Sequence, residues 1–297
     1  MKNLVFHIGH HKTATTWLQS GYFSEHPQVL LATDFHKPWD DDFLAYLIGS
    51  TDREFSVTTC RNILEGRLLS IFSDQHKVIV VSAERLSGHP YSGGYDSYTI
   101  ANRIHDCFPD ARILMSIRDQ ISMLVSVYKQ LVLEGYLGTF TDMIESTQWK
   151  GTAFSLDMYK YDRIVSKYLE LFSREKVLVL TYEKFLNDKA GYINQLSGFL
   201  NIDCFEPGNF NFVVNQAASK SRIKATRILN YFKKSELNPF PLLQLNPSII
   251  RLLEFILSRA LGDFQVDDKQ LEKLRDYYAP SNVSLRKLLD DELMGYS

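Results

Sequence analysis

Asn-Leu-Val-Phe-His-Ile-Gly-His-His-Lys-Thr-Ala-Thr-Thr-Trp, residues 3–17, is the stretch that decides the fold. The apolar run Leu4–Ile8 predicts a buried strand that ends at Gly9. A polar turn with Lys12 follows, and then a segment with helical character begins. A strand, a tight turn and a helix N-terminus form a cradle for an anion, because the first N–H groups of a helix have no partner within it. Further hydroxyl donors come from Thr13, Thr15 and Thr16. We therefore expect a phosphate or sulfate group to bind to this turn.

This turn differs from the common phosphate loop of nucleotide-binding proteins. The Walker pattern is a glycine, four residues and then Gly-Lys-Ser/Thr. Here Gly9 lies only three positions before Lys12, and His11 stands where the second glycine would be. The alternative is an ordinary strand-to-helix turn with a threonine-rich helix start.

Length and charge limit the classes of function. The chain has 297 residues, of which 45% are hydrophobic, so it can bury a large core. Its formal net charge is −2, which argues against nucleic acid as a partner and means that any anion site is local.

The cysteines and the hydropathy pattern indicate the cellular setting. Cys60, Cys107 and Cys204 lie far apart, without a CxxC or Cys/His cluster, which predicts free thiols and neither a disulfide framework nor a metal site. No run reaches the roughly 18 apolar residues of a transmembrane helix. We expect a cytoplasmic protein without an integral membrane segment, and the sequence leaves its oligomeric state open.

Short apolar runs alternate with helical periodicity over the first 200 residues. The runs that predict buried parallel strands are Leu4–Ile8, Val78–Ser82, Arg112–Ile117 and Val177–Thr181. The segments that predict helices are Thr13–Phe23, Arg53–Ser73, Ile100–Cys107, Asp119–Glu134 and Asp157–Phe172. This alternation predicts an α/β fold with a parallel sheet covered on both faces. Because ligands bind beyond the carboxyl ends of such strands, we expect functional residues just after each strand.

The chain changes character after residue 201. A loop-like stretch, Cys204–Asn215, precedes the basic helical segment Ser219–Lys234, and Pro239 and Pro241 interrupt the chain. Further helices are expected at Ile249–Ala260, Asp268–Tyr278 and Ser281–Leu289. We predict an α/β core at 1–234 and a helical C-terminal extension at 235–297 that packs on the core.

One strand end carries an arginine that suits a phosphate group. Arg118 follows the predicted strand Arg112–Ile117, and its planar guanidinium can bind a phosphate in bidentate fashion. Ser126 lies eight residues later, two helical turns on and near the same face. The alternative is a surface arginine in an ion pair and an ordinary helix serine.

Another strand end carries a candidate base. Glu84 follows Val78–Ser82 and is expected at the same edge of the sheet as Lys12, where a carboxylate can accept a proton from an acceptor hydroxyl. A structural ion pair of Glu84 with Arg85 or Lys12 is the alternative. His10 and His11 are competing bases, although their place in the turn suits contact with sulfate better.

Several of these segments resemble the sulfotransferases, which use 3′-phosphoadenosine 5′-phosphosulfate (PAPS) as the sulfuryl donor. The run His11–Gln19 resembles their 5′-phosphosulfate loop, whose usual motif is Lys-Thr/Ser-Gly-Thr-Thr, so Ala14 replaces the customary glycine. The spacing from Arg118 to Ser126 resembles their 3′-phosphate element, although Gln120 stands where the family often has proline. Ser82-Ala83-Glu84 is similar to the Ser-x-Glu strand end of carbohydrate-type and bacterial members, and Val177–Leu186 looks like the strand-Tyr-Glu-x-Leu stretch of the family.

The resemblance implies a P-loop-NTPase-like three-layer fold, PAPS as donor, 3′-phosphoadenosine 5′-phosphate (PAP) as product, and no metal. It implies catalytic roles for Lys12, which stabilises charge on the bridging oxygen of the donor, for Glu84 as base, and for His11. The residues implied to bind the donor are Lys12, Thr13, Ala14, Thr15, Thr16, Trp17, Arg118, Ser126, Lys220 and Arg222. Tyr182 and Glu183 are expected to be structural, and Lys220 and Arg222 are either donor contacts or part of a solvated basic helix face.

The acceptor is expected to be a hydroxyl of a carbohydrate, a glycolipid or another small molecule. Aromatic residues in two loops are candidates to line its cleft: Phe35, Trp39, Tyr91, Tyr95 and Tyr98. Two other functions stay open. One is a nucleotide-dependent kinase, which the missing Walker spacing disfavours, and the other is a non-catalytic nucleotide-binding protein of the same fold, which Ala14 keeps possible.

Overall fold

The computed structural model describes residues 3–10, 12–33, 40–90, 93–145, 154–208 and 220–289. Contacts within the chain group it into two compact units. The first comprises Met1–Asp119, Ser155–Phe210 and Pro280–Ser297, and the second comprises 120–154 and 211–279. The predicted boundary between residues 234 and 235 lies inside the second unit, and the division predicted from the sequence stays a prediction.

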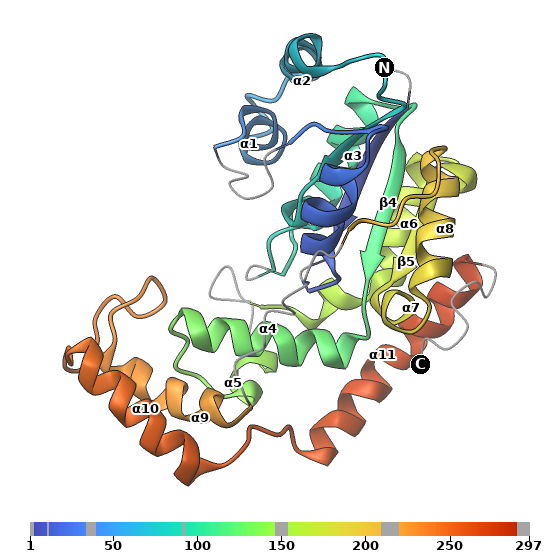
Figure 1. The fold of residues 1–297 in the computed structure, drawn as a ribbon. Helices are drawn as coiled ribbons and strands as arrows, with labels where there is room; N and C mark the ends of the chain where they lie inside the picture. Colours follow the sequence, from blue (N-terminus) through green and yellow to red (C-terminus); the bar gives the residue numbers. More distant parts are fainter. Residues whose placement is uncertain are drawn as a thin grey trace. The chain divides into compact units, whose positions relative to one another are not determined.

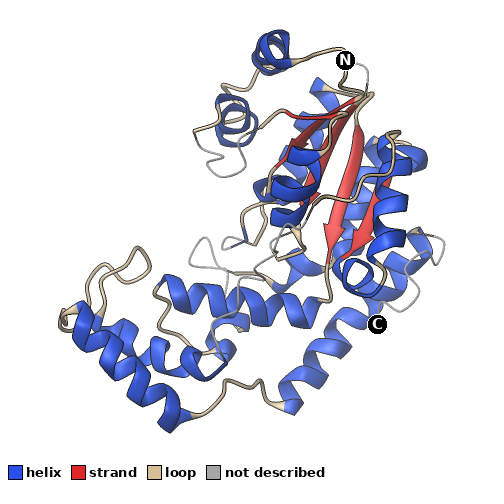
Figure 2. Ribbon diagram, viewed as in Figure 1, coloured by secondary structure: helices blue, strands red, loops and turns tan. Residues whose placement is uncertain are grey.

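The first unit contains a parallel sheet with strand order β2-β3-β1-β4-β5 (Figure 2). The strands are β1 (Leu4–Gly9), β2 (Val29–Leu31), β3 (Val78–Ser82), β4 (Arg112–Ile117) and β5 (Val177–Thr181). The four strands predicted from apolar runs are confirmed. The short edge strand β2 was missed, because its three residues are too few to give a periodic signal.

Helices flank this sheet, which confirms the predicted α/β fold (Figure 1). After β1 the chain enters a π-helical segment, η1 (Trp17–Phe23). The other helices of the unit are α1 (Asp42–Gly49), α2 (Val57–Ile71), η2 (Glu84–Ser87), α3 (Ser97–Cys107), η5 (Leu156–Tyr159), α6 (Tyr161–Leu171), η6 (Arg174–Lys176), α7 (Tyr182–Asn187) and α8 (Lys189–Leu200).

The parallel register aligns the carboxyl ends of the central strands at the same end of the sheet. His7 of β1 lies opposite Ser82 of β3, and Gly9 lies opposite Ser116 of β4. All residues of β1, β3 and β5 are buried, as expected for strands covered on both faces. The residues that follow these strands are therefore neighbours at one rim.

The second unit is helical in its described part. Its helices are α4 (Gln120–Glu134), α5 (Phe140–Ile144), α9 (Lys220–Leu229), η7 (Asn230–Phe232) and α10 (Pro247–Leu261). The α9 helix packs against α4 and α10. The buried Asn230 side chain joins η7 to the C-terminal end of α4. Its amide donates to the carbonyl of Val132 at 2.7 Å and to that of Tyr136 at 3.1 Å.

Two predicted helices near the C-terminus form one. The expected pair Asp268–Tyr278 and Ser281–Leu289 is a single helix, α11 (Asp268–Leu288), with Pro280 inside it. The prediction that the helix breaks near Pro280 is wrong. It rested on proline, which lacks the N–H for an intrahelical hydrogen bond. Packing explains the continuity, since Tyr278 and Leu285 on either side of the proline are buried.

Candidate functional site

The site is built around the turn between β1 and η1. Lys12 and Ala14 both have a positive φ, 65° and 63°. The Thr13 hydroxyl between them donates to the His10 carbonyl at 2.6 Å and holds the turn closed. Backbone N–H groups of a chain that alternates in this way point into a concave surface, which favours an anion.

The helix that follows begins directly after this turn. The Leu18 N–H donates to the Ala14 carbonyl at 3.0 Å, so the N–H groups before Leu18 are those of the first turn. Thr13 and Thr15 are buried, whereas Thr16 is exposed. The positive end of the helix dipole therefore lies at the Lys12 turn, as the sequence predicted.

Gly9 is required by close packing between the strand end and the helix start. A Cβ at position 9 would overlap the Thr15 methyl group, and it would lie 3.3 Å from the His7 ring. The absence of a side chain at Gly9 thus lets Thr15 sit directly on the end of β1.

Thr15 also links the turn to the end of β3. Its hydroxyl donates a hydrogen bond to the Glu84 carboxylate, and Glu84 is half-buried at the start of η2. Arg85, an expected ion-pair partner of Glu84, forms an ion pair with Asp96. The structure thus brings Glu84 to the Lys12 turn through Thr15.

Arg118 links the turn to the end of β4. Its guanidinium donates to the Lys12 carbonyl at 3.2 Å and lies 4.6 Å from the centre of the Tyr182 ring. The next residue, Asp119, donates its N–H to the Glu183 carboxylate at 3.1 Å. Tyr182 and Glu183 therefore hold the end of β4 in place.

A buried polar network beneath the turn was not found from the sequence. His7 is fully buried, with Nδ1 at 2.7 Å from the Ser82 hydroxyl and Nε2 at 3.0 Å from the Ser116 hydroxyl. The Gln19 amide donates to the Ser82 hydroxyl at 2.9 Å. The network crosses three strands, β3, β1 and β4.

Burial keeps the His7 ring neutral. Desolvation lowers the pKa of His7 to about 4, and the nearby negative charge of Glu84 opposes this only in part. The missed signal was a single histidine in an otherwise apolar strand, with Ser82 opposite it on β3 and Ser116 two residues beyond its partner Leu114 on β4.

The remaining predicted donor residues are distributed over both units. Ser126 lies on α4 and Arg222 on α9, both in the second unit. Arg222 forms an ion pair with Glu254 at 2.8 Å. The Trp17 ring is buried and packs 4.8 Å from the Phe185 ring, with the Lys189 ammonium 4.8 Å from its centre. The side chain of Lys220 and all of His11 lie outside the described residues.

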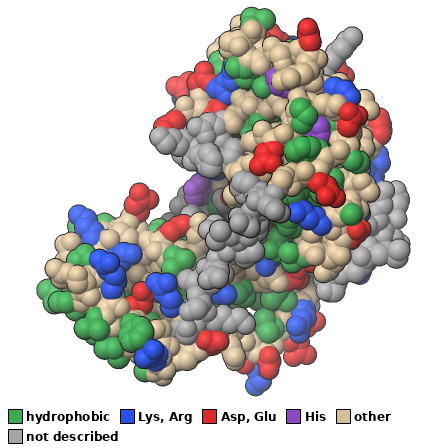
Figure 3. Space-filling model, viewed as in Figure 1, with side chains coloured by type: hydrophobic (Ala, Val, Ile, Leu, Met, Phe, Trp, Pro, Cys, Tyr) green, Lys and Arg blue, Asp and Glu red, His purple; other side chains and the backbone are tan. Residues whose placement is uncertain are grey.

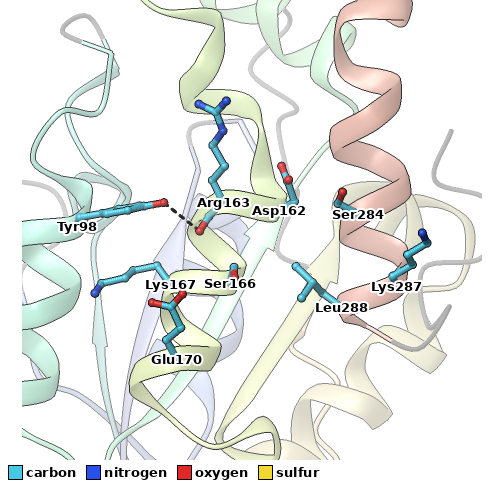
Figure 4. Close-up of a pocket in the computed structure, with 9 residues that line it drawn as sticks. All are labelled: Tyr98, Asp162, Arg163, Ser166, Lys167, Glu170, Ser284, Lys287 and Leu288. Carbon is cyan, nitrogen blue, oxygen red and sulfur yellow. Dashed lines mark hydrogen bonds between the residues drawn. The ribbon is translucent and has the colours of Figure 1, made fainter.

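Of the aromatic residues that are candidates to line an acceptor cleft, some lie outside the described residues and others are described. Phe35, Trp39 and Tyr91 lie outside the described residues, and Tyr95 is exposed. Tyr98 lines a pocket of about 590 Å³ formed by α3, α6 and the C-terminal part of α11 (Figure 4). Its hydroxyl donates to the Arg163 carbonyl at 3.2 Å, and the charged side chains of Lys167 and Glu170 share the pocket. The lining contains no residue of the Lys12 turn.

Among the described residues, no group of three or more His, Cys, Asp or Glu side chains could hold a metal ion. Within the same residues, no helix is long and apolar enough to cross a membrane.

Comparison with known proteins finds a family match over part of the chain. No curated protein sequence matches the chain. The profile of a sulfotransferase family matches residues 95–207, which include β4, β5 and Arg118 but not the Lys12 turn. Over these residues the chain matches the sulfotransferase family.

Solved structures of sulfotransferases are similar to this chain, and the first of them shares its fold. The sulfotransferase from Alicyclobacillus acidocaldarius is 18% identical, with 100% of this chain and 99% of that chain covered and a TM-score of 0.61. Mouse sulfotransferase SULT7A1, in complex with PAP, is 14% identical, with 98% and 89% covered and a TM-score of 0.47. The sulfotransferase domain of the olefin synthase from Synechococcus PCC 7002 is 12% identical, with 90% and 98% covered and a TM-score of 0.40.

Proposed function

We propose that this protein is a sulfotransferase that moves a sulfuryl group from PAPS to a hydroxyl of a small acceptor, with a carbohydrate or glycolipid as the expected acceptor class. The observation that carries the proposal is the convergence of three strand ends on one anion cradle. Arg118 bonds to the Lys12 carbonyl, and Thr15 bonds to Glu84.

The Lys12 turn suits the 5′-phosphosulfate of the donor. Its backbone N–H groups and threonine hydroxyls supply fixed dipoles, and Lys12 supplies a full charge. Among the described residues, the Lys12 ammonium forms no ion pair, so its charge is available to a ligand. A preorganised cation of this kind is worth several kcal/mol where charge develops in the transition state, typically about 3 kcal/mol.

The transfer is an in-line displacement. The bond between sulfur and the bridging oxygen of PAPS breaks while a bond from the acceptor oxygen to sulfur forms. Negative charge accumulates on the bridging oxygen beside Lys12, and PAP leaves. The proton of the acceptor hydroxyl passes to Glu84, which lies at the rim and is partly open to solvent.

Arg118 is proposed to bind the 3′-phosphate together with Ser126, as the resemblance implies. Its half-buried position and its bond to the Lys12 carbonyl make it a rigid anchor. Lys220 and Arg222 are proposed to contact the donor as well. For Arg222 this requires release of its ion pair with Glu254.

The test is turnover of labelled PAPS by a Lys12→Ala variant. We expect the rate to fall by roughly two to three orders of magnitude with an unchanged circular dichroism spectrum, because only the transition-state charge loses its partner. Lys176→Ala is the matched control. The Lys176 ammonium lies 3.4 Å from the Asp110 carboxylate, away from the Lys12 turn, so this variant should retain full activity. Near-normal turnover of Lys12→Ala would contradict the proposed mechanism.

The acceptor class needs a separate experiment. Wild-type protein and labelled PAPS are incubated with a panel of sugars, glycolipids, phenols and sterols, and the transfer of label is measured. We expect sugar-bearing acceptors to be sulfated. Transfer to phenols or sterols alone would overturn the acceptor class and leave the donor assignment intact.

A further inference from the structure

The second unit exposes an unusual number of large apolar side chains on one segment. The most exposed are three in the loop before α10 and three on α10 itself. They are Phe240 (90% exposed), Leu242 (78%), Leu243 (61%), Leu252 (60%), Phe255 (54%) and Ile256 (51%). We call these six side chains the apolar face. Monomeric soluble proteins rarely expose so many neighbouring apolar groups without a binding role.

The helix α10 exposes apolar side chains to solvent, whereas a helix that packs on a core buries them. None of its residues is fully buried. One side contacts α9, where Ile250 and Glu254 line a groove and Glu254 accepts hydrogen bonds from Arg222 and Thr226. At 100° per residue, Leu252 and Ile256 lie on the opposite side from Ile250 and Glu254. The inner side is thus already occupied, and the outer, apolar side is left exposed.

Positive charge surrounds the apolar face. Residues 220–261 contain eight Lys and Arg against two acidic residues, although the whole chain carries a formal charge of −2. One of these acids, Glu254, is paired with Arg222. Arg251 and Arg259 are exposed on α10, and the Arg259 guanidinium lies 4.1 Å from the centre of the Phe255 ring. In Figure 3, hydrophobic and basic side chains gather side by side over the segment that Figure 1 labels α9 and α10.

We propose that the apolar face docks the protein onto the surface of an anionic lipid bilayer. Exposed Leu, Ile and Phe side chains enter the boundary between headgroups and acyl chains, while flanking Lys and Arg side chains attract anionic headgroups. This combination is that of a helix lying in the membrane interface, and it needs no membrane-spanning segment.

Charge complementarity favours lipid over a second copy of the chain. A symmetric dimer through this face would bring the same basic residues of both copies together. Such like-charge contacts oppose association, whereas an anionic bilayer attracts the exposed charges of Arg251 and Arg259.

The experiment is flotation of the full chain with large unilamellar vesicles. One set consists of phosphatidylcholine with 30% phosphatidylserine and the other of phosphatidylcholine alone. We expect the protein to float with the anionic vesicles and remain unbound with the neutral ones, and we expect 0.5 M salt to weaken binding because it screens the charges.

Two double variants test the residues. Phe240→Ser with Leu242→Ser, and Arg251→Glu with Arg259→Glu, should each weaken partition into anionic vesicles by about tenfold or more. Leu69→Ser is the apolar control, since Leu69 is 89% exposed on α2 of the first unit. Arg53→Glu with Lys77→Glu is the charge control, since both residues are exposed in the first unit. Circular dichroism and thermal melting establish that each variant is folded.

Three results would overturn the proposal. The first is wild-type protein that does not bind the anionic vesicles. The second is binding that the folded patch variants retain in full. The third is a dimer of the wild type, seen by light scattering, that either patch variant converts to a monomer, because a second copy would then be the occupant. Vesicle binding does not use PAPS, so these results are separate from those that test sulfuryl transfer.

Discussion

At the scale of single residues, Ala14 shows why this turn usually contains glycine in the family that the sequence resembles. The φ of Ala14 is 63°, in the left-handed region, where a Cβ costs roughly 1 kcal/mol relative to glycine. Lys12 has a φ of 65° and bears the same kind of strain. The turn therefore stores conformational energy next to the proposed donor site.

Substitutions at position 14 should follow this backbone conformation. Ala14→Gly should leave the melting temperature unchanged or raise it slightly, since the relief of strain offsets the greater flexibility of glycine in the unfolded chain. Ala14→Val should lower stability by about 2 kcal/mol, because a β-branched residue is least tolerant of a positive φ. Thermal and urea unfolding measure both. Equal stability of the Gly and Val variants would contradict this account.

His7 should make stability depend on pH. The pKa of His7 is about 4 in the folded protein against 6.5 for the exposed side chain, so the unfolded chain takes up a proton first on acidification. The contribution of neutral His7 to the free energy of unfolding is fully present above pH 6.5 and is lost as the pH falls to about 4. The shift corresponds to about 3 kcal/mol.

The measurement is urea unfolding of wild type and His7→Gln between pH 7.5 and pH 4.5. Glutamine keeps polar contacts with Ser82 and Ser116 but does not titrate. We expect the variant to be less stable at pH 7.5 and to lose less stability on acidification than the wild type. Parallel pH profiles of the two proteins would exclude His7 as the source.

Some site residues were predictable one by one and others were not. Glu84 and Arg118 could be predicted, because each follows an apolar run directly and a parallel sheet gathers such positions at one edge. The His7 network could not, since Ser82 and Ser116 come within reach of His7 only when β3 and β4 pair with β1.

At the scale of elements, the three central strands act as a frame that fixes the turn. Arg118 at the end of β4 bonds to the carbonyl of Lys12, and Thr15 bonds to Glu84 after β3. The turn is thus tied to both neighbours of β1. Strands made of continuous apolar residues gave a clear pattern, whereas β2 has three residues and gave none.

Arg118→Ala should weaken the binding of PAP by roughly 10- to 100-fold, because a charged, half-buried hydrogen-bond donor to phosphate is removed. Isothermal titration calorimetry with PAP measures the change. Arg163→Ala is the control, since Arg163 pairs with Asp157 at 3.3 Å and lies in the pocket around Tyr98. Unchanged PAP affinity of a folded Arg118→Ala variant would remove Arg118 from the donor site.

Helix ends were predicted less well than helix positions. The expected helix Arg53–Ser73 begins four residues later, at Val57, because the Ser56 side chain accepts the Thr59 N–H and caps it. Pro280 was expected to separate two helices, yet burial of the residues on both sides keeps α11 continuous. Local patterns predict helices, and tertiary packing decides where they end.

At the scale of the whole molecule, ligand binding should raise the stability of the native state. PAP at a concentration 100 times its dissociation constant adds about 2.7 kcal/mol, which corresponds to a rise in melting temperature of about 5 °C. ATP at the same concentration should give a much smaller shift, because it lacks a 3′-phosphate for Arg118. An equal or larger shift with ATP would favour the kinase alternative.

The division of the chain into units was the least predictable level. The second unit combines residues 120–154 with residues 211–279, segments separated by a large part of the first unit. Asn230 joins them through hydrogen bonds to carbonyls that lie 98 and 94 positions away in the chain. Composition and linker signals follow the order of the chain, so they do not reveal an arrangement of this kind.

The tight fit between Gly9 and Thr15 also bears on how this protein can change over evolutionary time. A methyl group at position 9 has no space, so every natural or laboratory variant there should lose the folded turn. Position 14 accepts a methyl group at a modest energetic cost. Random mutagenesis with selection for function should therefore retain glycine at position 9, while alanine and glycine exchange freely at position 14.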